Sequence, residues 1–304
     1  MKLPVNVGKH PVGSPEWHDA RRVTINGSEI AAVLGISPYE SPFSLWHRKN
    51  GNLGDVEQTP EMYWGTALEG VICEEFARRH PDLLTLDGGG LWRHPDRTWQ
   101  GGSPDGRLFT RDNMLDRPDA LLEAKTDRYG DRWGDEGTDQ FPVHYRAQGL
   151  WYLDVFGLKV CHFAVLIAGS EYREYRLEHS EAEVAPMRSA AREFLDTLAG
   201  DPPPLDGSEA TYEAVKELHP DIDGHEVDLD PDVAMPYLRA LAVHKDAETE
   251  KRRAAAEVIA SMGTAQYARW SGERIASRVA KGNNPPHLRA ANGASELLRE
   301  ATPA

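Results

Sequence analysis

Cysteine is scarce in this sequence, and its scarcity excludes several kinds of site. The chain has 2 cysteines, Cys73 and Cys161, which lie far apart and form no Cys-x-x-Cys pair. A disulfide framework, a zinc site of known spacing and an iron–sulfur cluster each need more thiols. We expect both residues to be small components of a core. The phosphate-binding loop GxxxxGK(S/T) is also missing, which argues against an ATPase or a helicase.

Long apolar runs are missing as well. No stretch approaches the roughly 20 apolar residues that a membrane-spanning helix needs, and the first residues lack the apolar centre of a signal peptide. The sequence therefore predicts a soluble, cytoplasmic protein without a membrane partner. Its 304 residues and hydrophobic content of 40% suffice for one sizeable core and a smaller appendage.

Positive charge is in short supply, and the formal net charge is −15. The deficit is uneven, because residues 201–232 hold eleven acidic residues and one lysine, a net of −10 that leaves −5 for the rest. Residues 239–281 hold nine Lys or Arg against five Asp or Glu, a local excess of +4. A local patch can bind phosphates on an acidic chain. The balance argues against tight non-specific DNA binding, but it is compatible with an acidic site that holds metal.

The residue pattern predicts an α/β chain in which strands lie between helices. Caps, breakers and periodicity indicate helices over 28–34, 42–46, 66–79, 143–156 and 182–198. They indicate strands around 83–92, 104–109 and 119–125, and a hairpin of 159–167 with 171–177. The Gly- and Asp-rich loop over 127–142, which carries Trp133, is expected at the surface near the site.

Asp201-Pro-Pro-Pro204 is the strongest boundary signal in the chain. It predicts a first domain over 1–200 and, over 201–304, an acidic linker followed by a helical and hairpin extension of unknown role. The extension should hold a helix over 233–262 and a hairpin of 266–270 with 274–280, and the tail after residues 283–286 should be loose. Its basic residues can contact DNA phosphates, or the extension can be a solvated appendage or an oligomer contact. These basic residues are Arg252, Arg253, Arg269, Arg274, Arg278 and Lys281.

Two short segments carry the candidate chemistry, Ser103-Pro-Asp-Gly106 and Leu121-Leu-Glu-Ala-Lys125. Residues two apart on a strand point to one face, so Glu123 and Lys125 should project together. If Asp105 meets Glu123 from a neighbouring turn, two carboxylates converge beside an ammonium, and the Ala124 carbonyl can add a further oxygen. Magnesium commonly binds one or two carboxylates plus substrate phosphate. The plainer interpretation is a surface salt bridge between Glu123 and Lys125.

Five ordered motifs between about residues 17 and 178 resemble the YqaJ/lambda-exonuclease family of viral recombination nucleases, within the PD-(D/E)xK superfamily. They are Trp17-His-x-x-Arg21 leading to Gly27-Ser-Glu-Ile30, Gly65-Thr-Ala-Leu-Glu69, the Ser103–Gly106 turn, Glu123-Ala-Lys125 and Tyr145-Arg-Ala-Gln148. The resemblance implies a restriction-endonuclease-like core with a central mixed β-sheet flanked by helices.

The resemblance also implies roles for single residues. Asp105, Glu123 and the Ala124 carbonyl would bind Mg²⁺, with Mn²⁺ as a substitute, Lys125 would be catalytic, and Glu69 would support a second metal or its water. Arg21, Ser28, Ser103 and Gln148 would hold the terminal 5′-phosphate of DNA, since guanidinium, hydroxyl and amide groups suit phosphate. Plainer interpretations remain open: Ser28 can cap a helix, Gln148 can be solvated, and Glu69 can favour a helix dipole.

The resemblance implies an exonuclease that digests double-stranded DNA from 5′ ends and leaves 3′ single strands for phage-type recombination. It also implies a single-strand annealing protein as partner and a ring-shaped trimer. Two alternatives remain open: a structure-specific endonuclease on the same core, and a non-catalytic module that binds DNA ends or a partner protein.

Overall fold

A five-stranded mixed sheet forms the centre of the first of two units, which divide between Asp221 and Ile222. The computed structural model describes residues 2–11, 13–113, 117–282, 284–295 and 297–298. Within these residues, no helix is both long and apolar enough to cross a membrane. The two units are described separately.

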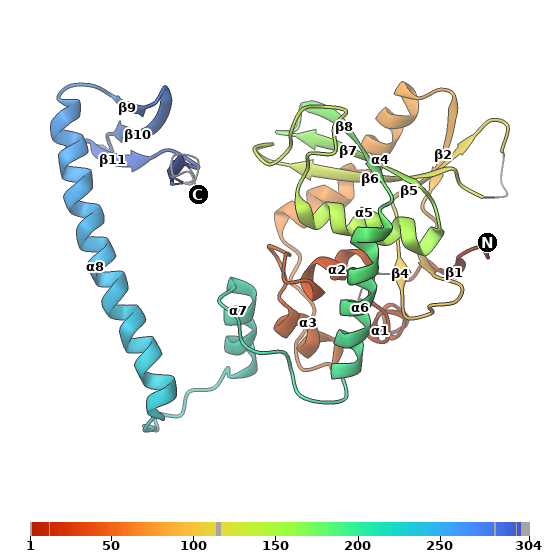
Figure 1. Ribbon diagram of the computed structural model, residues 1–304, viewed down its shortest axis with the longest axis horizontal. Coiled ribbons are helices and arrows are strands. Elements are labelled where there is room, and N and C mark those ends of the chain that lie inside the picture. Colours follow the sequence, from red (N-terminus) through yellow and green to blue (C-terminus); the bar gives the residue numbers. More distant parts are fainter. Residues whose placement is uncertain (1, 12, 114–116, 283, 296, 299–304) are drawn as a thin grey trace. The chain divides into compact units, whose positions relative to one another are not determined.

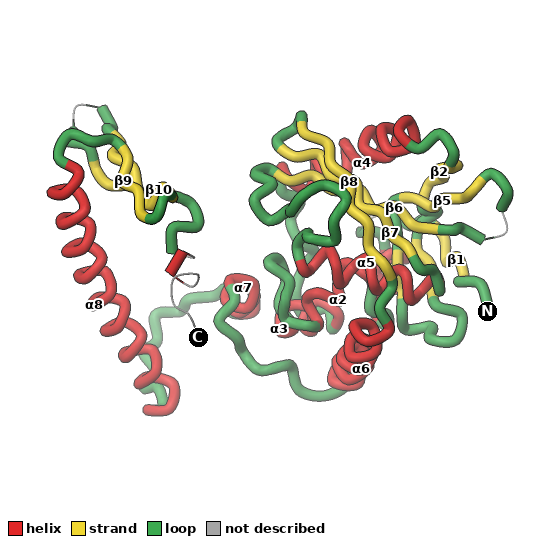
Figure 2. The backbone as a smooth tube through the Cα atoms, turned by 45° about the horizontal axis from the view of Figure 1, so that its top comes forward, coloured by secondary structure: helices red, strands yellow, loops and turns green. Residues whose placement is uncertain are grey.

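The central sheet has the strand order β2-β5-β6-β7-β8 (Figures 1 and 2). Its strands are β2 (Leu83–Asp87), β5 (Gly106–Thr110), β6 (Ala120–Asp127), β7 (Val160–Ile167) and β8 (Glu171–Glu178). Only the β6–β7 pair is parallel, and helix α5 (Val143–Phe156) forms the crossover that a parallel pair requires. The predicted hairpin of β7 and β8 and the predicted helix over 143–156 are confirmed.

Helices cover both faces of this sheet. On one face, α4 (Pro60–Arg79) packs Ile72 and Phe76 against Leu122 and Ala124 of β6. On the other face lies the larger core, with side chains from α5, α2 (Gly27–Val33) and α6 (Glu181–Thr197). The predicted fold class is confirmed as an α/β core with a central mixed sheet flanked by helices.

A small second sheet, which the sequence analysis did not predict, joins the N-terminus to the core. It contains β1 (Val5–Gly8), β3 (Leu91–Arg93) and β4 (Gly101–Gly102) in the order β1-β3-β4. The unpredicted helix α1 (Pro15–Arg22) follows β1, with Ser14 as its N-cap. These strands are too short to show an alternating pattern, and β4 consists of glycine alone.

The contacts of α7 (Glu209–Leu218) place it with the first unit, beyond the boundary predicted at residue 200. Its Ala214 is buried against Phe43 and Leu53, and its Thr211 hydroxyl donates a 2.7 Å hydrogen bond to Ser41 at the N-cap of α3 (Pro42–Lys49). Helix α6 ends at Thr197, before the proline run, and the chain after that run returns to pack on the core. The acidic stretch is therefore divided between the two units.

The second unit consists of one long helix and a small sheet. Helix α8 (Pro231–Met262) is followed by β9 (Tyr267–Trp270), β10 (Glu273–Val279) and β11 (His287–Ala290). The helix and the β9–β10 hairpin were predicted. The expectation of a loose tail is wrong for residues 287–290, because β11 pairs with β10 over four residues. The tail residues 283, 296 and 299–304 lie outside the described part.

The loop over 127–142 is anchored rather than simply exposed. Trp133 is 5% exposed and stacks on Phe141, and its indole N–H donates to the Asp127 carboxylate. The expectation that the loop carries Trp133 on the surface is therefore wrong. Burial of a large aromatic ring stabilises such a segment far more than solvent contact of its polar residues.

Candidate active site

The central sheet opens where β5 begins. Strand β5 pairs with β6 only as far as Gly106 opposite Leu122. Beyond that point the described part of β6 keeps β7 on one edge, but its other edge has no strand beside it. There the Ala124 N–H donates a 2.8 Å hydrogen bond to the Asp105 carboxylate instead. The Ser103–Gly106 turn is thus fixed against β6, and Asp105 is brought next to the Glu123–Lys125 segment as predicted.

Glu123 and Lys125 project from the same face of β6, as the strand period predicts. The Glu123 side chain is 2% exposed, and its Oε1 accepts a 2.7 Å hydrogen bond from Lys125 Nζ. The Lys125 ammonium also lies 4.9 Å from the ring centre of Tyr145. Because both side chains are largely buried, this pair is not the surface salt bridge of the plainer interpretation.

Gln148 on α5 contacts the same carboxylate. Its side-chain amide donates 2.6 Å and 3.0 Å hydrogen bonds to Glu123 Oε1 and to the Tyr152 hydroxyl. The Tyr152 ring lies against two glycines: a Cβ at Gly27 or Gly102 would come within 2.2 Å or 2.6 Å of it. Larger residues at these two positions would displace the ring. The glycines therefore position the tyrosine and, through it, the amide beside Glu123. Gln148 is buried, so its solvated alternative is wrong.

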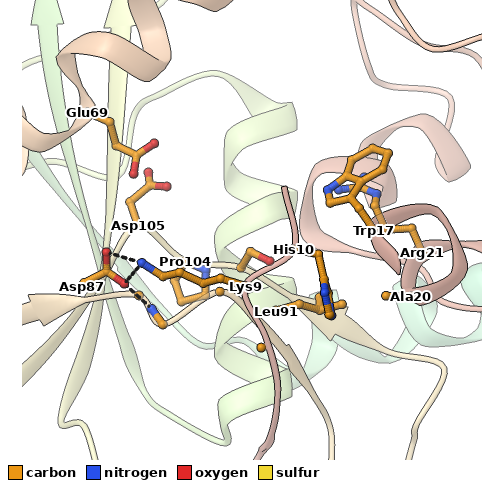
Figure 3. Close-up of a pocket in the computed structure, with 15 residues that line it drawn as sticks. Lys9, His10, Trp17, Ala20, Arg21, Glu69, Asp87, Leu91, Pro104 and Asp105 are labelled. Atoms are coloured by element: carbon orange, nitrogen blue, oxygen red, sulfur yellow. Dashed lines mark hydrogen bonds and ion pairs between the residues drawn. The ribbon is translucent and has the colours of Figure 1, made fainter. Parts of the chain in front are cut away.

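Glu69 on α4 faces Asp105 across a pocket of about 390 Å³ (Figure 3). The same pocket reaches Ser103, Trp17 and Arg21. It therefore joins two groups of predicted site residues: the carboxylates lie at one end and the Arg21 guanidinium at the other, and Ser103 also lines the wall (Figure 3). Neither Glu123 nor Lys125 lines this pocket in the part of the chain that is described; they adjoin it through Asp105.

Burial is the main cause that raises the pKa of the carboxylates of the site. Burial, and then the Asp105 charge, raise the pKa of Glu123 to about 8. The same two causes raise the pKa of Glu69 to about 7, and burial raises that of Asp105. Burial lowers the pKa of Lys125, but the attraction of Glu123 and Asp105 outweighs it, so this pKa is raised. In their ionised forms the three carboxylates carry more negative charge than the single ammonium offsets.

Arg21 on α1 forms the cationic end of the pocket. Its guanidinium lies 3.1 Å from Ser28 Oγ and 3.0 Å from Glu29 Oε1, and 4.6 Å from the ring centre of Trp17. The N-cap of α2 is Asn26, so Ser28 does not cap this helix. The structure thus brings Arg21 and Ser28 together, with Ser103 on the wall of the same pocket. Gln148 stands apart from them, at Glu123.

A buried ion network supports Arg21 from behind. Lys49 is 4% exposed at its side chain, and its ammonium contacts Glu29 Oε2 at 3.1 Å and the Arg21 and Thr24 carbonyls. Burial raises the pKa of Glu29, but Arg21, Lys49 and the Asn26 N–H outweigh it and lower that pKa to about 2. Glu29 is therefore ionised and bridges two cations, one buried and one on the pocket wall.

Several pocket residues were not predicted from the sequence. Lys9 and His10 follow β1, and Gly88 to Gly90 line the pocket beside them, since a Cβ at Gly90 would lie 2.7 Å from Lys9 Cγ. Lys9 pairs with Asp87 at 2.7 Å. A Cβ at Gly88 would lie 1.6 Å from the Pro104 carbonyl oxygen, so this glycine allows the wall to approach the Ser103–Gly106 turn. The run of three glycines was the available signal for such a close approach.

The donor set at Asp105 and Glu123 fits a hard divalent cation. Among the residues that the structure describes, Glu123 Oε2 is buried without a hydrogen-bond partner, which leaves one carboxylate oxygen for another ligand. Oxygen donors of this kind are those that magnesium prefers. A cation would also relieve the repulsion that raises the carboxylate pKa values.

Asp154, His179 and Glu181 form a second group that could hold a metal, with ligand atoms within 4.8 Å of one another. Here the acids already have cationic partners: Arg97 and Arg188 lie 2.7 Å and 2.8 Å from the two Asp154 oxygens, and Arg188 also pairs with Glu181. A metal ion would have to displace these guanidinium groups. The Asp105 site is therefore the better candidate.

Comparisons with known proteins identify relatives of the chain. Residues 16–159 match the model of the YqaJ-like viral recombinase domain. The uncharacterized protein YqaJ of Bacillus subtilis is 31% identical over 211 residues, which cover 67% of this chain and 63% of that protein. A protein of African swine fever virus is 32% identical over 101 residues, 31% of this chain and 27% of that protein. The chain thus spans less than two thirds of either relative.

Two solved structures also resemble the chain. The alkaline exonuclease of Laribacter hongkongensis is 21% identical, covers 61% of this chain and 93% of its own, and gives a TM-score of 0.47. A phage-related exonuclease of Haemophilus somnus is 10% identical, covers 60% of this chain and 97% of its own, and gives 0.43.

Fold and site together define an α/β protein whose core sheet carries a centre of carboxylates and one lysine. Over residues 16–159, the chain matches the family of YqaJ-like viral recombinase domains. The resemblance seen in its five motifs is confirmed.

Proposed function

We propose that this protein is a magnesium-dependent deoxyribonuclease that digests double-stranded DNA from 5′ ends and leaves 3′ single strands for recombination. The observation that carries the proposal is one pocket lined by Glu69 and Asp105 at one end and by Arg21 at the other, with Ser103 also on its wall (Figure 3). A terminal phosphate at Arg21 would place the following DNA backbone towards the carboxylates. The viral recombinase domain supports the same class of reaction.

The residues present would divide the reaction between them. Asp105, Glu123 and the Ala124 carbonyl would hold Mg²⁺, or Mn²⁺ in its place, and Glu69 would support a second ion or its water. A bound ion supplies polarisation of the scissile phosphate and activation of water. Lys125, held by Glu123 and by the face of Tyr145, would orient the attacking water and offset charge that develops on the phosphate.

Arg21, Ser28 and Ser103 would bind the terminal 5′-phosphate. The guanidinium is fixed before substrate arrives, because Glu29 and the Trp17 ring hold it, and a fixed fork of N–H donors suits phosphate. Gln148 belongs to the same proposed set by resemblance, and its contact with Glu123 adds a role in orienting that carboxylate.

The partners proposed from the family are double-stranded DNA ends, a single-strand annealing protein and two further copies in a trimeric ring, in the host cytoplasm if a phage encodes the chain. An endonuclease on the same core is the second candidate, since the carboxylate centre itself needs no DNA end. The intact set of Asp105, Glu123 and Lys125 argues against a non-catalytic module.

A matched set of DNA substrates tests the proposal. We expect Mg²⁺-dependent release of nucleotides from a linear duplex, faster from a 5′-phosphate than from a 5′-hydroxyl. A label at the 5′ end of a strand should be released first, whereas a label at the 3′ end should stay on the remaining strand. A closed circular duplex should remain intact. Cutting of the circle at a comparable rate would favour the endonuclease, and no cleavage of any substrate in Mg²⁺ or Mn²⁺ would favour the binding module.

A further inference from the structure

The small sheet of the second unit presents one face that is rich in cations. Strand β10 lies between β9 and β11, and both neighbours are antiparallel to it. Figure 1 shows these strands beside the C-terminal end of α8. Two observations, register and exposure, define what each face carries.

Register assigns the side chains to faces. Arg274 lies opposite Arg269, and Ser277 lies opposite both Tyr267 and Arg289. Opposite residues of an antiparallel pair share a face, as do residues two apart on a strand. A register shift after Arg274 keeps it on the face of Ser277. We call this the basic face; its members are Tyr267, Arg269, Arg274, Ser277, Val279, His287 and Arg289.

The two faces differ in exposure as they do in composition. On the basic face, Tyr267 and the three arginines are exposed. On the opposite face, Ala276 is buried, and Ala268 and Leu288 are half-buried. That apolar face matches a half-buried stripe on α8, which contacts β9; the stripe consists of Ala255, Val258, Ile259 and Met262. The basic face is therefore the outer face of this unit.

The arginines of the basic face have no carboxylate partner among the described residues. Arg253 on α8, by contrast, pairs with Glu250 and Glu257. The acidic residue of β10, Glu273, lies opposite Trp270 and so belongs to the other face. In a chain with a net charge of −15, a sheet face with three arginines and no acid is an isolated positive surface.

Two of these charges are placed directly against each other. Arg269 and Arg274 are cross-strand partners, and like charges in that position destabilise a sheet. The Arg274 guanidinium lies 4.0 Å from the Tyr267 ring centre, which fixes it in place. An anion bound between the two guanidinium groups would remove the repulsion and accept hydrogen bonds from both.

We propose that the basic face binds the phosphodiester backbone of DNA. Each of its three adjacent strands carries one arginine, so the face can contact several phosphates of one DNA backbone. Guanidinium groups bind phosphate through paired N–H donors. The structure also narrows the set of basic residues expected from the sequence. Arg278 lies on the other face and donates to the Gly263 carbonyl, and Arg252 and Arg253 lie on α8. Arg289 joins the set.

The test compares two triple variants of the full chain that remove equal charge. One is Arg269→Ala/Arg274→Ala/Arg289→Ala on the basic face; the other is Lys251→Ala/Arg252→Ala/Arg253→Ala on the exposed part of α8. Binding to a labelled duplex with closed hairpin ends, and to single-stranded DNA, is measured in EDTA by fluorescence anisotropy over a range of salt. Closed ends and EDTA keep the result independent of the proposed nuclease reaction.

We expect the basic-face variant to bind about tenfold more weakly and to lose roughly 2–3 from its log–log salt slope, about 0.9 for each phosphate contact on duplex DNA. The α8 variant should stay close to wild type. Replacing the same three arginines by lysine should retain most of the slope, because the charge remains. The DNA for which the basic-face variant loses more affinity, duplex or single strand, is the ligand of this face.

Three outcomes would overturn the proposal. The first is an unchanged affinity and salt slope of the basic-face variant on both DNAs. The second is an equal loss of affinity in the α8 variant, which would mean that net charge alone matters. The third is an equal loss of affinity in the lysine variant, which would mean that the alanine substitutions damaged the sheet itself.

Discussion

The side-chain amide of Gln148 donates a 2.6 Å hydrogen bond to the Glu123 carboxylate, and so links helix α5 to the strand that carries the candidate metal ligand. We expect Gln148→Ala to raise the Mg²⁺ concentration needed for half-maximal cleavage by about 10–100-fold, as is typical when a partner of a metal ligand is removed. A magnesium titration of the cleavage rate measures this. An unchanged magnesium requirement with a lost preference for 5′-phosphate would place Gln148 at the DNA end instead.

Replacement of Lys125 tests whether its buried ion pair with Glu123 contributes to catalysis. We expect Lys125→Ala to lower the cleavage rate by 10²–10³, about 3–4 kcal/mol, because a positioned charge in a site that excludes water stabilises developing charge strongly. Lys159→Ala, at an exposed position before β7, is the matched control and should cleave normally. Equal rates for Lys125→Ala and wild type at saturating magnesium would leave Lys125 as a structural ion pair.

Arg21 and Arg22 are neighbours with different surroundings, which makes them a test of the end pocket. Arg21 lines the pocket, whereas Arg22 is 64% exposed at its side chain and lies 3.8 Å from Asp19. We expect Arg21→Ala to narrow the rate advantage of 5′-phosphorylated over 5′-hydroxyl ends, and Arg22→Ala to preserve it. If both variants keep the wild-type ratio, the terminal phosphate is bound elsewhere.

The Glu29 network links stability to pH. Its pKa of about 2 in the fold lies below the ordinary value of 4.5, so its contribution is complete above pH 4.5 and is lost as the pH falls towards 2. We expect Glu29→Gln to lower the free energy of unfolding at pH 7 by about 3–5 kcal/mol, because Lys49 stays buried without its partner. The difference from wild type should shrink at pH 3.

Urea denaturation at pH 7 and pH 3 measures the Glu29 effect, with Glu57→Gln at an exposed loop position as control. A constant difference between Glu29→Gln and wild type at both pH values would show that the carboxylate charge contributes nothing. Since Glu29 also holds Arg21, the same variant should weaken the preference for 5′-phosphate.

The parts of the fold that follow a simple period could be predicted from the sequence. The shared face of Glu123 and Lys125 follows from strand alternation, and helix α5 follows from a continuous helical run. The meeting of Asp105 with Glu123 could only be stated as a condition from the sequence, because it depends on where β5 stops pairing with β6. Backbone pairing over long separations leaves no local signal.

The missed elements depend on tertiary contacts. Strand β4 is Gly101–Gly102, which has neither side-chain alternation nor strand propensity. Helix α7 lies in an acidic stretch that resembles a linker, and its helical packing depends on Phe43 and Ser41 of a distant segment. The sequence places Trp133 in a polar loop and does not show that its ring packs against other aromatic residues, such as Phe141 and Tyr175.

The proposed nuclease function depends on a metal ion bound at Asp105 and Glu123, and one measurement tests this location most directly. Cleavage of a linear 5′-phosphorylated duplex in Mg²⁺ is compared for wild type, Glu123→Gln and Glu181→Gln, with folding checked by circular dichroism. We predict that Glu123→Gln loses detectable cleavage while it remains folded, and that Glu181→Gln, at the arginine-paired group around Asp154, cleaves at the wild-type rate. Cleavage by Glu123→Gln together with its loss in Glu181→Gln would contradict the account.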